Sequence, residues 1–193
     1  MRRNHFLRAI WMGLLAAGLN GCAGVMMGGV AGGATAAHDT RTTGTIVEDE
    51  AIELKAANAF FNNKAINDQA HINVTSYNNI VLVTGETPTA SLHDEVINIV
   101  KNIAKVRKVY DELAIAAPSA MVSRSSDTVL TGKVKAQIFG IKDFDPTKIK
   151  VVTERGIVYL MGLVTKADGD KVTDVARQVG GVQKVVKLFE YTG

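Results

Sequence analysis

The sequence predicts an α+β fold made of two consecutive copies of one small unit, each with the element order α-β-β-α-β. The first observation behind this prediction is an internal repeat, since strand-like residues recur 77 positions later: Ile72 and Ile149, Val74 and Val151, Ile80 and Ile157, Gly85 and Gly162. The second is a Val-x-x-Val motif at 106–109 that recurs at 182–185. Similarity at a nearly fixed spacing indicates repeated structural units.

Each copy begins with a predicted helix, over residues 49–62 and 127–139. The apolar or small residues that recur about every fourth position in these segments are Ile52, Ala56 and Phe60, and Leu130, Val134 and Ile138. Such spacing gives a helix one apolar face. Asp49 and Asp127 open the two segments and are predicted to cap the helix N-termini, because a carboxylate can accept hydrogen bonds from the first free amides.

A β-hairpin is predicted after the first helix of each copy, with Val- and Ile-rich strands around polar turns at 76–79 and 154–156. The second helix and the closing strand of the two copies are predicted over residues 91–104 and 167–179, and over 108–115 and 184–191. A small three-stranded sheet covered on one face by two helices is the simplest arrangement that buries these apolar residues.

The chain begins with the layout of a secretory signal. Arginines precede a short apolar run, Ile10 to Leu19, which ends in Leu19-Asn20-Gly21-Cys22. A basic segment, a short apolar segment and small residues at the cut are typical of such signals, and the run is too short to span a bilayer comfortably. We expect residues 1–21 to be removed. A plain cleaved signal and a short anchor are the alternatives to a modified Cys22.

Two segments are predicted to connect rather than to pack. Residues 22–44 begin with a Gly/Ala-rich stretch without helical or strand periodicity, which favours a flexible tether. Residues 118–126 contain Pro118 and a Ser-rich run, and are predicted to link the two units.

Composition argues against two classes of function. The chain carries 22 Lys and Arg against 19 Asp and Glu, but the net charge of +3 comes from Arg2, Arg3 and Arg8 in the signal. Without the signal the chain is formally neutral, which argues against a nucleic-acid partner. The single cysteine permits no disulfide within the chain and no cysteine-based metal site.

The two units resemble the BON domain family. The resemblance rests on the element order, on the strand that ends in Gly85 or Gly162, and on the Val-x-x-Val entry to the last strand. Three stretches carry it further: Ala70-His71-Ile72-Asn73-Val74-Thr75, Val152-Thr153-Glu154-Arg155-Gly156 and Leu160-Met161-Gly162-Leu163-Val164-Thr165. The resemblance implies BON domains over 45–117 and 127–193.

Two such units behind Leu-Asn-Gly-Cys are similar to the dual-BON-domain outer-membrane lipoproteins. This resemblance implies a lipid on Cys22, which would hold the protein on the periplasmic side of the outer membrane. Ala23 agrees with that destination, because lipoproteins retained at the inner membrane typically carry aspartate at this position.

No set of residues has the spacing of an active site, so we expect no enzymatic activity, no cofactor and no small-molecule substrate. His71 and His93 lack a second histidine or cysteine at ligand spacing, and no metal site is predicted. Asp168 and Asp170 flank a glycine as in part of a calcium loop, but the remaining ligands of such a loop are missing. Ser123 and its neighbours have no adjacent base.

Charge differs between the two copies. Residues 45–117 carry 6 basic and 10 acidic side chains, a net −4, whereas residues 123–193 carry 12 basic and 8 acidic, a net +4. Chance variation on solvated surfaces is one interpretation. The other is that the second copy faces an anion, and for an exported, anchored protein the obvious anion is a phospholipid headgroup.

The first helix of the second copy offers a surface for such a contact. Val129, Gly132, Lys133 and Ala136 lie beside its apolar face, on a face of small residues next to a lysine. The resemblance implies that this helix binds anionic phospholipid. The family can carry tryptophan where this chain has Val129, so a shallower or more lysine-dependent contact is expected here. Phe139 is predicted to pack in the core.

The sequence therefore predicts a non-enzymatic, lipid-anchored protein that binds an anionic phospholipid membrane. The resemblance adds a role in outer-membrane integrity, with the division site and the outer-membrane protein assembly machinery as implied places of action. The alternative hypothesis is a periplasmic scaffold that docks on an envelope assembly complex, in which case the lysines are incidental.

Overall fold

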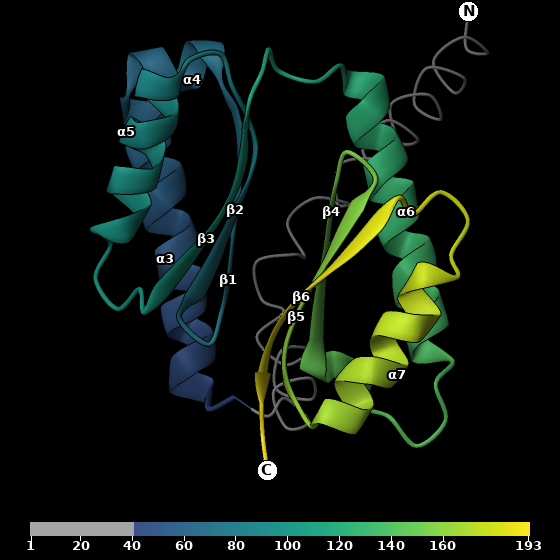
Figure 1. Ribbon diagram of the computed structural model, residues 1–193. Coiled ribbons are helices and arrows are strands. Elements are labelled where there is room, and N and C mark those ends of the chain that lie inside the picture. The colour runs from purple at the N-terminus through teal and green to yellow at the C-terminus, as the bar shows by residue number, and fades with distance from the viewer. Residues whose placement is uncertain (1–40) are drawn as a thin grey trace, which may run out of the picture. The chain divides into compact units, whose positions relative to one another are not determined.

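The computed structural model describes residues 41–193, so the predicted signal, Cys22 and most of the tether lie outside the described residues. The elements are α3 (Thr43–Asn62), α4 (Lys64–Gln69), β1 (His71–Tyr77), β2 (Ile80–Thr87), α5 (Ala90–Lys101), β3 (Lys108–Ile115), α6 (Met121–Phe139), η2 (Pro146–Lys148), β4 (Ile149–Glu154), β5 (Ile157–Val164), α7 (Lys166–Arg177) and β6 (Lys184–Tyr191) (Figure 1). We call α3 to β3 domain 1 and α6 to β6 domain 2. The predicted α+β fold with repeated α-β-β-α-β order is confirmed, with the short helices α4 and η2 as additions.

Each domain has one three-stranded sheet with its hairpin strands antiparallel and its closing strand parallel. In domain 1 the order is β1-β2-β3 and in domain 2 it is β4-β5-β6. The repeat extends to the register, because Ile72 pairs with Gly85 as Ile149 pairs with Gly162. A side chain at Gly85 would place its Cβ 2.0 Å from the carbonyl oxygen of His71, and its φ is +115°. The repeated glycine therefore allows two strands to approach closely.

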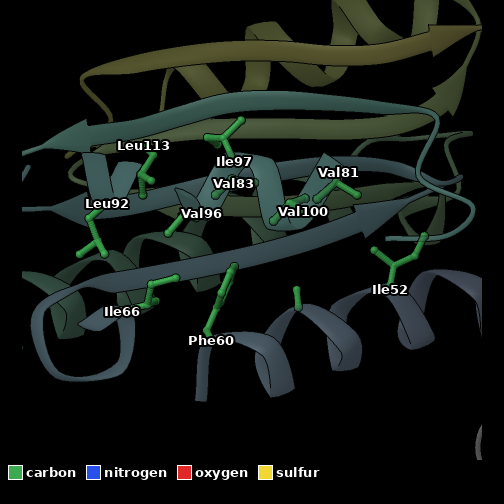
Figure 2. Close-up of a cluster of buried hydrophobic side chains, with 11 residues drawn as sticks. Ile52, Phe60, Ile66, Val81, Val83, Leu92, Val96, Ile97, Val100 and Leu113 are labelled. Atoms are coloured by element: carbon green, nitrogen blue, oxygen red, sulfur yellow. The ribbon is translucent and has the colours of Figure 1, made fainter. Parts of the chain in front are cut away.

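Helices α3 and α5 lie on one side of the domain 1 sheet, and α6 and α7 on one side of the domain 2 sheet (Figure 1). The core of domain 1 forms between helices and sheet from Ile52, Ala56, Phe60, Ile66, Val81, Val83, Leu92, Val96, Ile97, Val100 and Leu113 (Figure 2). The corresponding core of domain 2 contains Leu130, Val134 and Ile138 of α6. The predicted apolar faces of the two opening helices are thus the faces that pack.

Asp49 and Asp127 do not cap the helix N-termini, and that prediction is wrong. Both lie inside their helices and are buried, because α3 begins at Thr43 and α6 at Met121. The side chain of Thr42 caps α3 instead, accepting from the amide of Thr45. The interior placement of the aspartates gives them a different role, at the turns of the two hairpins.

Each of these aspartates holds a two-residue hairpin turn. The Asp49 carboxylate accepts from the backbone amides of Asn78 and Asn79 at 2.8 and 2.7 Å. The Asp127 carboxylate accepts from those of Arg155 and Gly156 at 2.8 and 2.9 Å. All four turn residues have positive φ, as both central residues of a type I′ turn must. A carboxylate from the first helix therefore fixes the turn in each repeat.

Helix α6 starts within the segment that the sequence assigned to a linker. Residues 118–126 were predicted to link the two units, but those from Met121 onward belong to helix α6. The hydroxyls of Ser125 and Ser126 donate to the carbonyls four residues earlier, at 2.9 and 3.1 Å. Serine can satisfy its hydroxyl on the preceding helical turn in this way, so the Ser-rich run did not mark a loop.

A third apolar cluster lies between the two sheets, on the faces that their own helices leave open. It contains Tyr77, Ile80 and Leu82 of domain 1 with Tyr159, Met161 and Leu188 of domain 2, all of them buried. Adjacent β-strand residues point to opposite faces. Val81 and Val83 accordingly enter the domain 1 core, whereas Ile80 and Leu82 enter this cluster, which we call the junction.

Polar contacts surround the apolar part of the junction. Lys150 of β4 reaches Glu53 of α3 at 2.7 Å, and Arg107 reaches Glu190 at 2.7 Å. The hydroxyl of Tyr77 donates to the carbonyl of Lys148 at 3.1 Å. Residues 41–193 accordingly belong to one compact unit.

Candidate functional site

The structure places the four residues of the predicted lipid-binding surface on the exposed side of α6. Val129, Gly132, Lys133 and Ala136 are all exposed, and 58% of the Val129 side chain is accessible. Nothing lies within 4 Å of the position that a Cβ at Gly132 would occupy. Opposite them, Leu130, Val134 and Ile138 are buried. The helix thus exposes its face of small residues to solvent and packs its buried apolar face against the sheet.

Large apolar residues extend this exposed face along the whole helix. Met121, Val122, Val129 and Phe139 are 71%, 78%, 58% and 76% exposed. At roughly 100° per residue they fall within about 100° of the helix circumference. Phe139 was predicted to pack in the core, and its exposure shows that prediction to be wrong. The reason is its position next to Ile138, which occupies the inward-facing side.

Cationic side chains and hollows accompany the apolar face. Lys133 and Lys135 lie to either side of it, and both are exposed. Val129, Lys133 and Arg155 line a cavity of about 810 Å³ between α6 and the loops of domain 2, and Lys133 and Ala136 line another of about 500 Å³ toward α7. An apolar strip with flanking cations is the pattern of a helix that can lie in a membrane interface.

Domain 1 also exposes an apolar strip, on α3. Val47, Leu54 and Phe61 are spaced by seven residues and are 59%, 63% and 74% exposed. A spacing of seven places residues on one face of a helix. This strip belongs to the domain with a net charge of −4, so an anionic surface would repel it.

At one end of the junction the two sheets bring together three side chains that sequence reasoning left apart. His71 of β1, Glu86 of β2 and Glu154 of β4 offer ligand-capable atoms that all lie within 4.8 Å of one another. Glu86 is 1% exposed and Glu154 6%. His71 and Glu86 face each other across β1 and β2, and Glu154 arrives from the other domain.

The electrostatics of this cluster are those of two buried carboxylates. Burial raises the pKa of the Glu154 carboxyl; the hydrogen bond from Asn73 opposes this, and the nearby Glu86 carboxylate adds to the rise. The amide nitrogen of Asn73 donates to Glu154 at 2.9 Å. Glu86 accepts from the amide of Ser119 at 3.2 Å through one oxygen only. Its other oxygen is buried without a hydrogen-bond partner among the described residues.

The sequence contained one signal for this cluster. Glu86 lies two and four residues after Thr84 and Leu82, in a strand where alternate residues share a face. A carboxylate in register with buried apolar residues indicates a buried charge. Its partner Glu154 could not be identified, because the pairing depends on how the two sheets meet.

Comparison with known proteins agrees with the repeated architecture. The BON domain model matches residues 48–117 and again 126–193. The outer membrane lipoprotein DolP of Haemophilus influenzae is 36% identical over 173 residues, 90% of each chain. The 21 kDa hemolysin of Actinobacillus pleuropneumoniae is 33% identical over 79% of each chain, and osmotically-inducible protein Y of Escherichia coli is 27% identical over 74% of this chain and 72% of that one.

Proposed function

The chain belongs to the BON domain family, and from that premise we propose that it is a non-enzymatic outer-membrane lipoprotein that binds anionic phospholipid through α6. Cys22 carries the lipid and holds the chain on the periplasmic side of the membrane. Support for the location comes from the signal-like segment before Cys22 and from the name of the relative that is 36% identical. We propose a role in outer-membrane integrity, exerted at the division site and near the assembly machinery for outer-membrane proteins.

The exposed apolar face of α6 is the observation that carries this proposal. Its 19 residues extend roughly 28 Å at 1.5 Å per residue, so the whole helix could lie along a membrane surface. Met121, Val129 and Phe139 would enter the headgroup region while Lys133 and Lys135 meet phosphate groups. A helix with an apolar face and flanking lysines is suited to an interfacial position. Within residues 41–193, no helix meets the length and hydropathy needed to cross a bilayer.

The required affinity is modest because the anchor already holds the chain at the membrane. A lysine near an anionic surface contributes about 1 kcal/mol, and a single acyl chain binds reversibly, so a second weak contact stabilises the attachment. The net charge of +4 on the second copy, against −4 on the first, would orient domain 2 toward the lipid.

Co-sedimentation of residues 38–193 with vesicles tests the proposal. We expect binding to phosphatidylglycerol-containing vesicles, weakened by salt, and little binding to pure phosphatidylcholine. Phe139→Ser and Lys133→Glu should each reduce binding several-fold. Phe61→Ser, which removes an equally exposed phenylalanine from α3, is the matched control and should leave it unchanged. Equal binding to neutral and anionic vesicles would exclude the electrostatic contact.

The alternative function is a periplasmic scaffold that docks on an envelope assembly complex. The observation that favours it is the strip of Val47, Leu54 and Phe61 on α3, which is apolar but carried by the acidic domain. Site-specific crosslinking from Leu54 and from Val129 in cells distinguishes the two functions. Protein adducts from position 54 that Phe61→Ser abolishes, with vesicle binding intact, would favour the scaffold.

A further inference from the structure

We propose that His71, Glu86 and Glu154 form a binding site for a divalent transition-metal ion, with Zn²⁺ as the simplest probe, at the junction of the two domains. The site adjoins Arg124 of α6, but it does not include Val129, Lys133 or Phe139 of the proposed phospholipid contact. It draws two ligands from domain 1 and one from domain 2, so that an ion bound there would connect the domains.

The first step of the argument is the spacing of the ligand atoms. One nitrogen of His71 and one oxygen each of Glu86 and Glu154 lie within 4.8 Å of one another. Zinc lies about 2.0–2.2 Å from each nitrogen or oxygen ligand. Small side-chain rotations would bring the three ligand atoms close enough together for one ion to contact all of them at that distance. The positions equivalent to these residues in the other copy are Lys148, Leu163 and Tyr77. The cluster is therefore a feature of the junction and not of the repeated fold.

The second step is the unsatisfied oxygen of Glu86. This side chain is 1% exposed, and its Oε1 has no hydrogen-bond partner among the described residues. The hydroxyl of Thr84, on the same face of β2, is likewise buried without one. Leaving a buried carboxylate oxygen unpaired is costly. An ion between Glu86 and Glu154 removes that cost and also the repulsion between the two carboxylates.

The third step concerns the contacts of the two ring nitrogens of His71 and the path by which an ion could reach them. Its Nε2 is 3.3 Å from the amide nitrogen of Asn73, and its Nδ1 is 3.4 Å from Nη1 of Arg124. Both neighbours are hydrogen-bond donors, and a donor needs a ring nitrogen with a lone pair. A neutral imidazole has one such nitrogen, so it can accept from one of the two neighbours. Either contact can give way to an ion. A cavity of about 200 Å³ lined by His71, Arg124 and Glu154 provides the entry.

The ligand types narrow the class of ion. One imidazole and two carboxylates, without a thiolate, are typical of zinc, manganese and iron sites, whereas calcium and magnesium prefer oxygen ligands alone. Asp127 lines the same cavity as Arg124, so the carboxylates of Glu86, Glu154 and Asp127 exceed the single guanidinium of Arg124 by two negative charges. A dication can therefore bind without creating a large excess of positive charge.

Zinc binding to residues 38–193, which contain all three apolar clusters, tests the proposal. Protein without a histidine tag is stripped of metal and titrated with zinc in competition with a chromophoric chelator. We expect one equivalent to bind and the thermal midpoint to rise by several degrees, since a ligand of the folded state stabilises it. His71→Gln, Glu86→Gln and Glu154→Gln should each weaken zinc affinity at least tenfold. Calcium should produce no shift.

His93→Gln is the matched control, since His93 also contacts carboxylates, those of Asp94 and Asp111, but away from the junction. It should retain full zinc affinity. Circular dichroism of each metal-free variant verifies folding. Absence of saturable zinc binding, or binding that survives both Glu86→Gln and Glu154→Gln, would overturn the proposal. So would a wild type indifferent to zinc in which Glu86→Gln alone raises the thermal midpoint, because the two carboxylates would then share a proton.

Discussion

The buried carboxylate of Asp49 connects several segments of domain 1. Asp49 accepts from Ser76 Oγ at 2.6 Å, from the amides of Asn78 and Asn79, and from Arg41 at 2.7 Å. A buried aspartate with this many donors is fully compensated, and hydrogen bonds to a charged group contribute more than those between neutral groups. The residue therefore ties α3, the first hairpin and the start of the described chain together.

Replacing Asp49 by alanine should lower the free energy of unfolding by about 3 kcal/mol, because it leaves several buried donors unpaired. Urea denaturation of residues 38–193 measures the change. Asp127→Ala should cost less, since Asp127 accepts from the two amides of Arg155 and Gly156, whereas Asp49 also accepts from Ser76 and Arg41. Asp174→Ala on exposed α7 is the control and should be neutral within about 0.5 kcal/mol. An Asp49→Ala variant as stable as the control would contradict this role for the carboxylate.

Two glycines should respond oppositely to alanine. At Gly85 the φ of +115° and a Cβ position 2.0 Å from a backbone oxygen predict a loss of about 3 kcal/mol. Gly132 lies in the middle of α6 on its solvent-exposed side, with open space around it. Alanine at this position should stabilise the protein by about 0.5–1 kcal/mol. Thermal unfolding of the two variants measures both effects, and the same sign of change at both positions would refute the prediction.

At the scale of single elements, the sequence predicted what depends on local pattern. Strands 108–115 and 184–191 and the apolar faces of both opening helices follow from periodicity alone. The beginnings of those helices did not, because Asp49 and Asp127 look like caps when their long-range partners in the hairpin turns are unknown. The exposure of Phe139, by contrast, could have been predicted from the apolar face of α6, because Phe139 follows Ile138 and lies about 100° around the helix from it.

The depth to which helix α6 enters the membrane can be tested at Val129. Val129 lies at the centre of the exposed apolar face, between Met121 and Phe139. Tryptophan at this position would add apolar surface and a polar tip suited to the interface. Val129→Trp should tighten binding to anionic vesicles about fivefold, which corresponds to about 1 kcal/mol, and shift the indole fluorescence to shorter wavelength.

The control for this prediction is Leu54→Trp on α3, which is comparably exposed but belongs to the acidic domain. Its fluorescence should not change when vesicles are added. An unshifted spectrum for Val129→Trp in the presence of anionic vesicles would show that α6 does not enter the interface.

At the scale of the whole molecule, the junction is the feature that no reading of either repeat reveals. Alternation in β2 and β5 shows that both faces of each sheet are apolar, through Val81 and Leu82 and through Leu160 and Met161. Such strands require cover on both sides. The sequence could thus have predicted a covered second face, although not that the other copy supplies the cover, nor that this brings Glu154 to His71.

Disrupting the junction should separate the domains without unfolding them. Leu82 is 1% exposed and points away from the helices of its own domain, so Leu82→Asp should open the junction, increase the radius of gyration in small-angle scattering and abolish the zinc-induced rise in thermal midpoint. Leu160→Ala, in the core of domain 2, should instead lower the free energy of unfolding by about 2–5 kcal/mol and leave the radius of gyration of the folded protein unchanged. A compact Leu82→Asp variant would show that the polar contacts of Lys150 and Arg107 suffice to hold the two sheets together.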